Sequence, residues 1–276
     1  MKGKWPRARW RFILHGEAPG AWNMAVDEAI ARMAGAGEVP PTLRVYAWSP
    51  PCISLGRHQP LADIDLERAR ADGIDIVRRP TGGRAILHAD EITYSVAGPP
   101  HEPRLQGMVL DVYQRLSDGL ILALEQLGVH VYKAEASARA GPDAGPICFQ
   151  VPSAYEIVTL DGRKIVGSAQ VRKRDWILQH GAIPLRGDVT RLAEYLALPE
   201  EKRRELKTAL AARAVSVEGY TGRPVSFQEA AEALREGFAR ALHLDLEPGE
   251  LTDAEYELAR TLAETVYAHP EWTTRV

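Results

Sequence analysis

Strand-forming segments come in runs along the first two thirds of the chain, and helical segments dominate the remainder. Residues 10–14, 43–48 and 74–79 are short stretches in which apolar side chains cluster or alternate, as they do in strands. After Gly187 the apolar side chains recur instead with helical spacing. Strands in runs followed by helices favour an α+β fold with a helix-rich C-terminal region.

Two long helices are also expected within the strand-rich part. One begins at Asn23, because asparagine is a common helix N-cap, and ends near Gly37. The other covers residues 109–127, where apolar side chains recur every three or four positions, and Gly128 ends it.

The chain contains no internal repeat and no linker long enough to separate two domains. We expect a single domain over residues 1–276, with a core at about 10–187 and a helical extension at about 188–276. Hydrophobic residues make up 45% of the sequence and charged residues 26%, which is ordinary for a packed globular protein.

Charge and cysteine content exclude several classes of protein. The net charge of −3 argues against a nucleic-acid partner. No apolar stretch approaches the ~20 residues that span a bilayer, so we expect no membrane insertion. The two cysteines, Cys52 and Cys148, are far apart, which argues against a disulfide framework and favours the cytoplasm. Because no His or Cys cluster has metal-ligand spacing, we propose no metal.

Cys148 is the candidate nucleophile. It follows a segment rich in glycine and proline and lies between Pro146 and Pro152, which favours an exposed turn over a regular strand. A free cysteine is more often a buried apolar residue, as we expect for Cys52. An unperturbed thiol is only a few per cent thiolate at pH 7, so a catalytic role requires an activating neighbour.

Lys164 is the candidate activator of that thiol. It follows Asp161-Gly162, a dipeptide typical of a two-residue hairpin turn, which would place Thr159 opposite Lys164 and Tyr155 opposite Ser168. The ammonium and the thiol can meet only if residues 146–152 fold back over the sheet. A thiol with such an activator indicates acyl transfer through a covalent thioester.

Arg79-Pro80-Thr81-Gly82-Gly83-Arg84 forms a glycine-rich turn between two strands. Adjacent glycines permit positive φ and close approach of the backbone to a ligand, although a plain strand connection is the commoner use. His88 follows in an apolar strand and by itself is typical of a hydrogen-bonded core or rim histidine.

A third segment, Gly167-Ser168-Ala169-Gln170, carries small side chains within a strand. Small side chains leave room for an aliphatic chain to lie against a strand, but they also permit dense sheet–helix packing. Gln179-His180-Gly181 places a polar pair within another apolar strand. That pair serves either an interior network or a ligand contact.

Together these segments resemble the lipoate/biotin protein ligase superfamily, and within it the LipM-type octanoyltransferases. The likeness covers nearly the whole chain, and the joint occurrence of the motifs is specific. The matching segments are Trp10–Ile13, Asn23–Ala29, Arg78–Arg84, Glu91–Val96, Cys148-Phe149, Pro152-Ser153, Gly162–Lys164, Gly167–Gln170, Ile177–Gly181, Ala263–Thr265, Tyr267-Ala268 and Glu271-Trp272.

The resemblance implies a biotin/lipoate protein ligase-like catalytic domain, a mixed β-sheet flanked by helices. It implies octanoyl transfer from octanoyl-acyl carrier protein to a lysine of a lipoyl-carrier domain, the glycine cleavage system H protein, with no cofactor. By resemblance Cys148 forms the acyl-thioester and Lys164 lowers its pKa. We expect a monomer. The substrate-binding residues that the resemblance implies are Arg79, Gly82, Gly83, Arg84, His88, Gly167, Ser168 and Ala169.

The chain departs from the family pattern after His88. The family usually places an aspartate there, whereas this chain has Ala89 followed by Asp90, so the role of that aspartate is shifted to Asp90 or lost. Three alternatives stay open: an ATP-dependent lipoate ligase, an octanoyl amidotransferase between lipoyl domains, and a non-catalytic lipoyl-domain binder. Arg84, in place of the third glycine usual in ligases, argues against the first.

Overall fold

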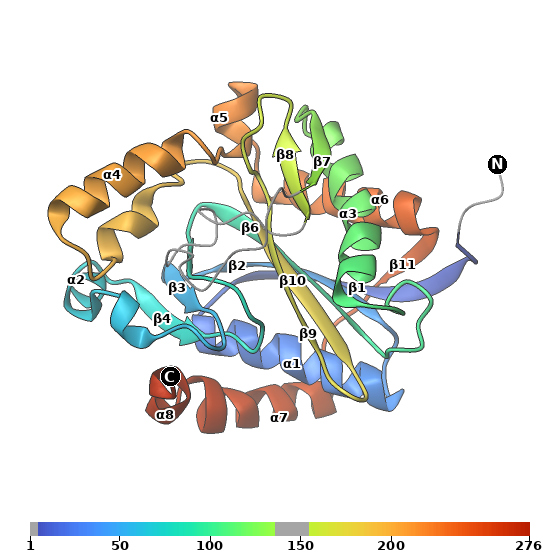
Figure 1. The fold of residues 1–276 in the computed structure, drawn as a ribbon. Coiled ribbons are helices and arrows are strands. Elements are labelled where there is room, and N and C mark those ends of the chain that lie inside the picture. Colours follow the sequence, from blue (N-terminus) through green and yellow to red (C-terminus); the bar gives the residue numbers. More distant parts are fainter. Residues whose placement is uncertain (1–4, 136–154) are drawn as a thin grey trace.

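A computed structural model describes residues 5–135 and 155–276. Its centre is a six-stranded sheet, shown in Figure 1, with the strand order β11-β1-β2-β6-β10-β9. Strands β11, β1 and β2 run parallel to one another, and the pairs β2–β6, β6–β10 and β10–β9 are antiparallel. The sheet is therefore mixed, as the resemblance implied. Its strands are β1 (Ala8–Ala18), β2 (Thr42–Trp48), β6 (Glu91–Gly98), β9 (Gly167–Arg172), β10 (Ile177–Pro184) and β11 (Leu244–Pro248).

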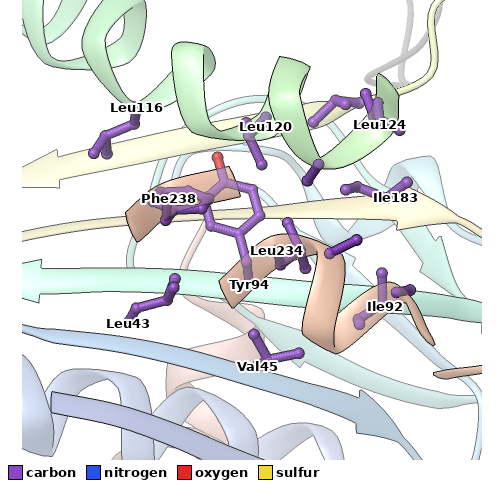
Figure 2. Close-up of a cluster of buried hydrophobic side chains, with 14 of the residues drawn as sticks. Leu43, Val45, Ile92, Tyr94, Leu116, Leu120, Leu124, Ile183, Leu234 and Phe238 are labelled. Carbon is purple, nitrogen blue, oxygen red and sulfur yellow. The ribbon is translucent and has the colours of Figure 1, made fainter. Parts of the chain in front are cut away.

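Helices cover both faces of this sheet (Figure 1). Helices α3 (Val109–Gln126) and α6 (Phe227–Leu242) pack together on one face. Helices α1 (Gly20–Ala36) and α7 (Asp253–Leu262) pack together on the other. Figure 2 shows leucines of α3 and α6, with Phe238, meeting apolar side chains of β2, β6 and β10 in the larger core cluster. The sheet is thus the middle layer of three.

A smaller sheet, ordered β4-β3-β5, lies beside the central one and carries the glycine-rich turn. Its strands are β3 (Cys52–Leu55), β4 (Asp75–Arg78) and β5 (Ile86–His88), and strands β7 (Val131–Glu135) and β8 (Tyr155–Thr159) form a separate pair. The remaining elements are η1 (Leu61–Asp63), α2 (Leu66–Ala71), η2 (Arg191–Tyr195), α4 (Glu200–Ala211), α5 (Val217–Thr221), η3 (Ala263–Tyr267) and α8 (Pro270–Thr274).

Three local expectations were wrong. Helix α1 begins at Gly20 with Pro19 as N-cap, so Asn23 lies inside the helix. Buried there, Asn23 Nδ2 donates to the carbonyls of Ala18 and Ala47 at 3.0 and 2.9 Å, so its hydrogen-bonding capacity ties the helix to the sheet. Strand β11 was missed altogether, although it extends the central sheet at its edge.

The hairpin register also differs from the expected one. Gly162 occupies a turn with φ of 84°, but Lys164 bridges to Val158 rather than to Thr159. Strand β8 pairs with β7, and β9 pairs with β10, so Ser168 lies opposite Gly181 and not opposite Tyr155. The chain therefore leaves the hairpin after Lys164 and joins the central sheet. Among the described helices, none is long and apolar enough to cross a membrane.

Candidate active site

A pocket forms where the glycine-rich turn, strand β9 and the inner strands of the central sheet meet. Apolar and aromatic side chains line it together with hydroxyl, imidazole and guanidinium groups. The described residues that line it are Met24, Tyr46, Trp48, Ser54, Arg79, Gly83, Ile86, His88, Thr93, Gly167, Ser168, Ala169, His180, Gly181 and Ala182.

Six of the eight substrate-binding residues expected from the sequence are in this lining: Arg79, Gly83, His88, Gly167, Ser168 and Ala169. Gly82 and Arg84 lie beside it, and their carbonyls accept hydrogen bonds from Arg79. Lys164 is not among the described lining residues. Cys148 lies outside the described residues, so its distance from Lys164 stays a prediction.

Gly83 is the glycine that the turn requires. Its φ is +93°, in the left-handed region that residues other than glycine rarely adopt. Its carbonyl also packs so closely on Gly56 that a Cβ at Gly56 would lie 1.9 Å from that oxygen. Gly82 has open space around it and no positive φ, so of the two adjacent glycines only Gly83 uses the conformational freedom that glycine permits.

Arg79 holds the turn in place from inside the protein. Its Nη1 donates to the Ser54 carbonyl at 2.8 Å, and its Nη2 donates to the carbonyls of Gly82 and Arg84, both at 2.8 Å. The side chain is only 3% exposed, so these bonds form where water does not compete strongly. The guanidinium therefore fixes the shape of the pocket rim.

His88 is held by Glu91 and not by Asp90. The imidazole Nδ1 lies 2.6 Å from Glu91 Oε1, and the indole ring of Trp48 stacks on the imidazole with centroids 3.9 Å apart. Asp90 has a positive φ of 53°, and its carboxylate points to Arg186 and Arg191. A residue in that conformation turns its side chain away from the strand. Asp90 therefore does not contact His88, and the carboxylate that does is Glu91.

His180 belongs to a second buried network, centred on Asp27 of α1. The Asp27 carboxylate accepts from Arg44 Nη1 and Ser95 Oγ, both at 2.7 Å, and from Tyr46 Oη at 2.8 Å. His180 Nδ1 lies 3.2 Å from the same carboxylate, and its Nε2 lies 2.7 Å from the hydroxyl of Thr81 in the glycine-rich turn. The network thus connects helix α1, the central sheet and the turn.

Burial and charge set the protonation of this network. Burial lowers the pKa of His180, which keeps the imidazole neutral near pH 7. Burial alone would raise the pKa of Asp27, but the Arg44 guanidinium and the hydrogen bonds from His180 and Ser95 outweigh it and hold that pKa below its ordinary value. A neutral His180 that donates from Nδ1 to a carboxylate accepts from Thr81 at Nε2.

Sequence reasoning missed Asp27, Ser54 and Glu91 as contributors to the site. One signal for Asp27 was available, since it lies three positions after Met24 and three before Ile30, on the apolar face of its helix. A carboxylate on such a face needs buried partners. Nothing local distinguished Ser54, because its partners are brought to it by sheet pairing.

Strand β9 provides the close packing expected from its small residues. A Cβ on Gly181, the partner of Ser168, would lie 2.6 Å from the Gly167 carbonyl oxygen and 2.7 Å from Ser168 Oγ. Ser168 Oγ also lies 2.8 Å from the hydroxyl of Tyr94. The small side chains therefore serve both sheet packing and the pocket wall.

Lys164 lies at the base of the hairpin that leads into β9. Its side chain is 5% exposed, and Nζ lies 2.8 Å from Glu156 Oε1. Its backbone is fixed by hydrogen bonds to Arg213 and Val215. The ammonium of Lys164 is thus held near β9 in an ion pair with Glu156. Within residues 5–135 and 155–276, no group of three or more His, Cys, Asp or Glu side chains could hold a metal ion.

The comparisons with known proteins agree with this geometry. Residues 19–239 match the lipoyl protein ligase A/B catalytic domain family. The chain is 45% identical to octanoyltransferase LipM of Symbiobacterium thermophilum, with 96% of this chain and 98% of the relative covered. It is 38% identical to octanoyltransferase LipM of Bacillus subtilis, with 95% and 97% covered.

Solved structures give the same result for the fold. The bipartite lipoate protein ligase of Thermoplasma acidophilum, solved with its E2 lipoyl domain, matches with a TM-score of 0.80 at 25% identity, covering 97% of this chain and 96% of that one. A lipoate-protein ligase A bound with ATP matches with a TM-score of 0.76 at 25% identity, covering 98% and 99%. The chain belongs to the lipoyl protein ligase A/B catalytic domain family, and within it to the LipM octanoyltransferases.

Proposed function

We propose that this enzyme transfers an octanoyl group from octanoyl-acyl carrier protein to a lysine of a lipoyl-carrier domain, the glycine cleavage system H protein, through a thioester on Cys148. The observation that carries the proposal is the pocket itself, which apolar and aromatic side chains line together with hydroxyl, imidazole and guanidinium groups. Such a pocket suits an acyl chain that ends in a reactive carbonyl. Burial of the chain contributes about 0.8 kcal/mol per CH₂ to binding.

In the first half-reaction the Cys148 thiolate attacks the thioester carbonyl of the donor. A new carbon–sulfur bond forms, and the carrier-protein thiol leaves. The ammonium of Lys164 favours the thiolate over the thiol, and its ion pair with Glu156 at 2.8 Å holds the ammonium in place. Backbone N–H groups of the glycine-rich turn or of Gly167-Ser168 stabilise the negative charge on the carbonyl oxygen.

In the second half-reaction the acceptor lysine attacks the enzyme thioester as a neutral amine. The carbon–nitrogen bond of the amide forms, the carbon–sulfur bond breaks, and Cys148 is regenerated. No nucleotide is consumed, since the thioester already carries the free energy for amide formation.

Intact-protein mass spectrometry tests the covalent step. The enzyme is mixed with octanoyl-acyl carrier protein without ATP, beside Cys148→Ala and Cys52→Ala variants. Cys52 is the matched control, because it is fully buried in β3 and burial raises the pKa of its thiol. We expect an octanoyl adduct that hydroxylamine removes on the wild type and on Cys52→Ala, and none on Cys148→Ala.

The opposite pattern identifies a ligase. If no adduct forms without ATP, but free octanoate with ATP modifies the H protein, the transferase proposal is wrong and the enzyme forms an acyl-adenylate. An adduct that persists on Cys148→Ala would move the nucleophile elsewhere in the chain.

A further inference from the structure

The pocket contains a hydroxyl–imidazole–carboxylate chain that the two half-reactions above do not use. Ser54 Oγ lies 2.7 Å from His88 Nε2, and His88 Nδ1 lies 2.6 Å from Glu91 Oε1. Ser54 and His88 both line the pocket. The three residues come from different strands, β3, β5 and β6, so their alignment depends on how the two sheets meet.

The partners of this chain fix the direction of its hydrogen bonds. A carboxylate only accepts, so in the neutral imidazole Nδ1 carries the proton and donates to Glu91. Nε2 then offers a lone pair to Ser54, whose hydroxyl donates to it. Arg79 Nη1 donates to Ser54 Oγ at 3.1 Å, which places a positive charge beside that oxygen. A hydroxyl arranged in this way can pass its proton to the imidazole.

Neighbouring groups hold the chain rigid. Trp48 stacks on the His88 ring with an interplanar angle of 11°, and its Nε1 donates to Thr93 Oγ1 at 2.8 Å. Thr93 in turn donates to Glu91 Oε1 at 2.6 Å. The similar Thr81–His180–Asp27 chain differs in one respect, because Thr81 is not among the described residues that line the pocket.

We propose that Ser54, His88 and Glu91 form the proton relay that takes up the proton released when the acceptor lysine attacks the octanoyl-enzyme. This inference rests on the proposed transferase function. As the carbon–nitrogen bond forms and the carbon–sulfur bond breaks, the amine proton passes to Ser54 Oγ and the Ser54 proton passes to His88 Nε2. Glu91 stabilises the resulting imidazolium, which releases its proton to the departing thiolate or to solvent.

A relay of this kind affects the two half-reactions differently. Acylation of the enzyme starts from a thiolate and needs no base for an amine, whereas transfer to lysine does. The charged and titratable groups that face His88 are Glu91, the Arg79 guanidinium beyond Ser54, and His180 across the pocket. The pH dependence of the second half-reaction therefore reflects the protonation of His88 together with these neighbours, and not of His88 alone.

The test is single-turnover kinetics of each half-reaction with full-length enzyme. Octanoyl-acyl carrier protein acylates the enzyme, and the isolated octanoyl-enzyme is then mixed either with unmodified H protein or with hydroxylamine, an amine that is already neutral at pH 7. The variants are Ser54→Ala, His88→Gln and Glu91→Gln. The control is Ser117→Ala, which removes a buried hydroxyl bonded to Tyr113 on α3, far along the chain from the relay.

We expect Ser54→Ala and His88→Gln to acylate within about 2-fold of the wild type but to transfer to H protein about 10²–10⁴-fold more slowly. Hydroxylamine should remove the octanoyl group from them, as octanoyl hydroxamate, at the wild-type rate. Glu91→Gln preserves the side-chain shape and should shift the pH profile of transfer, so it tests the relay even if Ser54→Ala folds poorly.

Normal transfer by Ser54→Ala, or an equal loss in both half-reactions, overturns the relay and leaves the transferase proposal intact. A wild-type enzyme that forms no octanoyl-enzyme overturns the transferase proposal and the relay with it.

Discussion

The two faces of the central sheet are built from different interactions. The face under α3 and α6 is apolar throughout its core, as Figure 2 shows around Leu120 and Phe238. The face under α1 also contains an apolar cluster, but a carboxylate, a guanidinium and an imidazole are buried beside it at Asp27, Arg44 and His180. The stability of one face therefore depends on how well apolar side chains fill the space, and that of the other on charge pairing and hydrogen-bond geometry.

This difference follows from position. The polar face adjoins the pocket, and Asp27 connects to the glycine-rich turn through His180 and Thr81. On the other face the described residues form a neutral chain instead, from Gln179 through Tyr94 to Ser168, and no charged side chain takes part in it. Substitutions that preserve shape should therefore be tolerated on the apolar face and costly on the polar one.

The largest effect is expected from Asp27→Asn. The amide keeps the shape of the side chain but removes the charge that pairs with Arg44, a guanidinium only 1% exposed. Removal of one partner from a buried pair costs about 3–5 kcal/mol, because the other charge is left uncompensated. Urea denaturation followed by circular dichroism measures this loss.

The matched control for that variant is Asp161→Asn. It removes an ion pair with Arg163 in which the Asp161 side chain is 49% exposed. We expect it to change the free energy of unfolding by less than about 1 kcal/mol. Equal losses at Asp27 and Asp161 would show that burial of the network contributes nothing.

On the apolar face, Leu120→Ala should cost about 2–5 kcal/mol, because Leu120 is fully buried on α3 and the substitution leaves a cavity. Leu120→Met, which nearly conserves volume, should cost less than about 1.5 kcal/mol. Thermal and urea unfolding of both variants give the comparison. If the methionine variant were as unstable as the alanine variant, the stability of the apolar face would not depend on side-chain volume.

The smallest effect is a pH dependence at His15, which lies at the edge of the polar face. Burial and then the Arg44 charge lower its pKa to about 4, and Arg44 Nε donates to its Nδ1 at 3.0 Å. Between about pH 6.5 and 4 the unfolded state therefore binds a proton that the folded state does not. Stability should be fully present above about pH 6.5 and fall as the pH drops towards 4.

His15→Gln keeps a hydrogen-bond acceptor for Arg44 and removes the titration. The free energy of unfolding, measured by urea denaturation from pH 7 to 4, should fall less for this variant than for the wild type, by about 2 kcal/mol over the range after allowance for partial exposure. His180 contributes to the slope in both proteins, so the difference isolates His15. Parallel curves would mean that His15 titrates alike in both states.

Much of the fold could be predicted from local pattern. The helix at 109–127 is α3, Val109–Gln126, and the strands expected at 43–48 and 74–79 are β2 and β4. These elements are long or strongly periodic, so burial leaves a clear trace in their sequence. Strand β11 was missed although Leu244-Asp245-Leu246-Glu247 alternates apolar and acidic residues, because these few residues follow α6 directly in a region dominated by helical spacing.

The sequence predicted which residues belong to the site better than it predicted which of them contact one another. The glycine-rich turn and the small residues of β9 were identified by composition and by resemblance, and the structure brings six of the eight together in one pocket. The role of the family's aspartate was expected to shift to Asp90 or be lost, and the Asp90 side chain contacts Arg186 and Arg191 rather than His88. The carboxylate beside His88 belongs to Glu91.

The sequence by itself determined the longer helices and most strands of the central sheet, the position of the glycine-rich turn, and the family to which the chain belongs. The tertiary structure alone decided that Asp27 meets His180 and that Ser54, His88 and Glu91 align. Asp27 and His180 are 153 positions apart, and a periodic pattern reports only whether a side chain is buried, not what it meets there. Sheet pairing makes those contacts, because it brings distant strands into a fixed register.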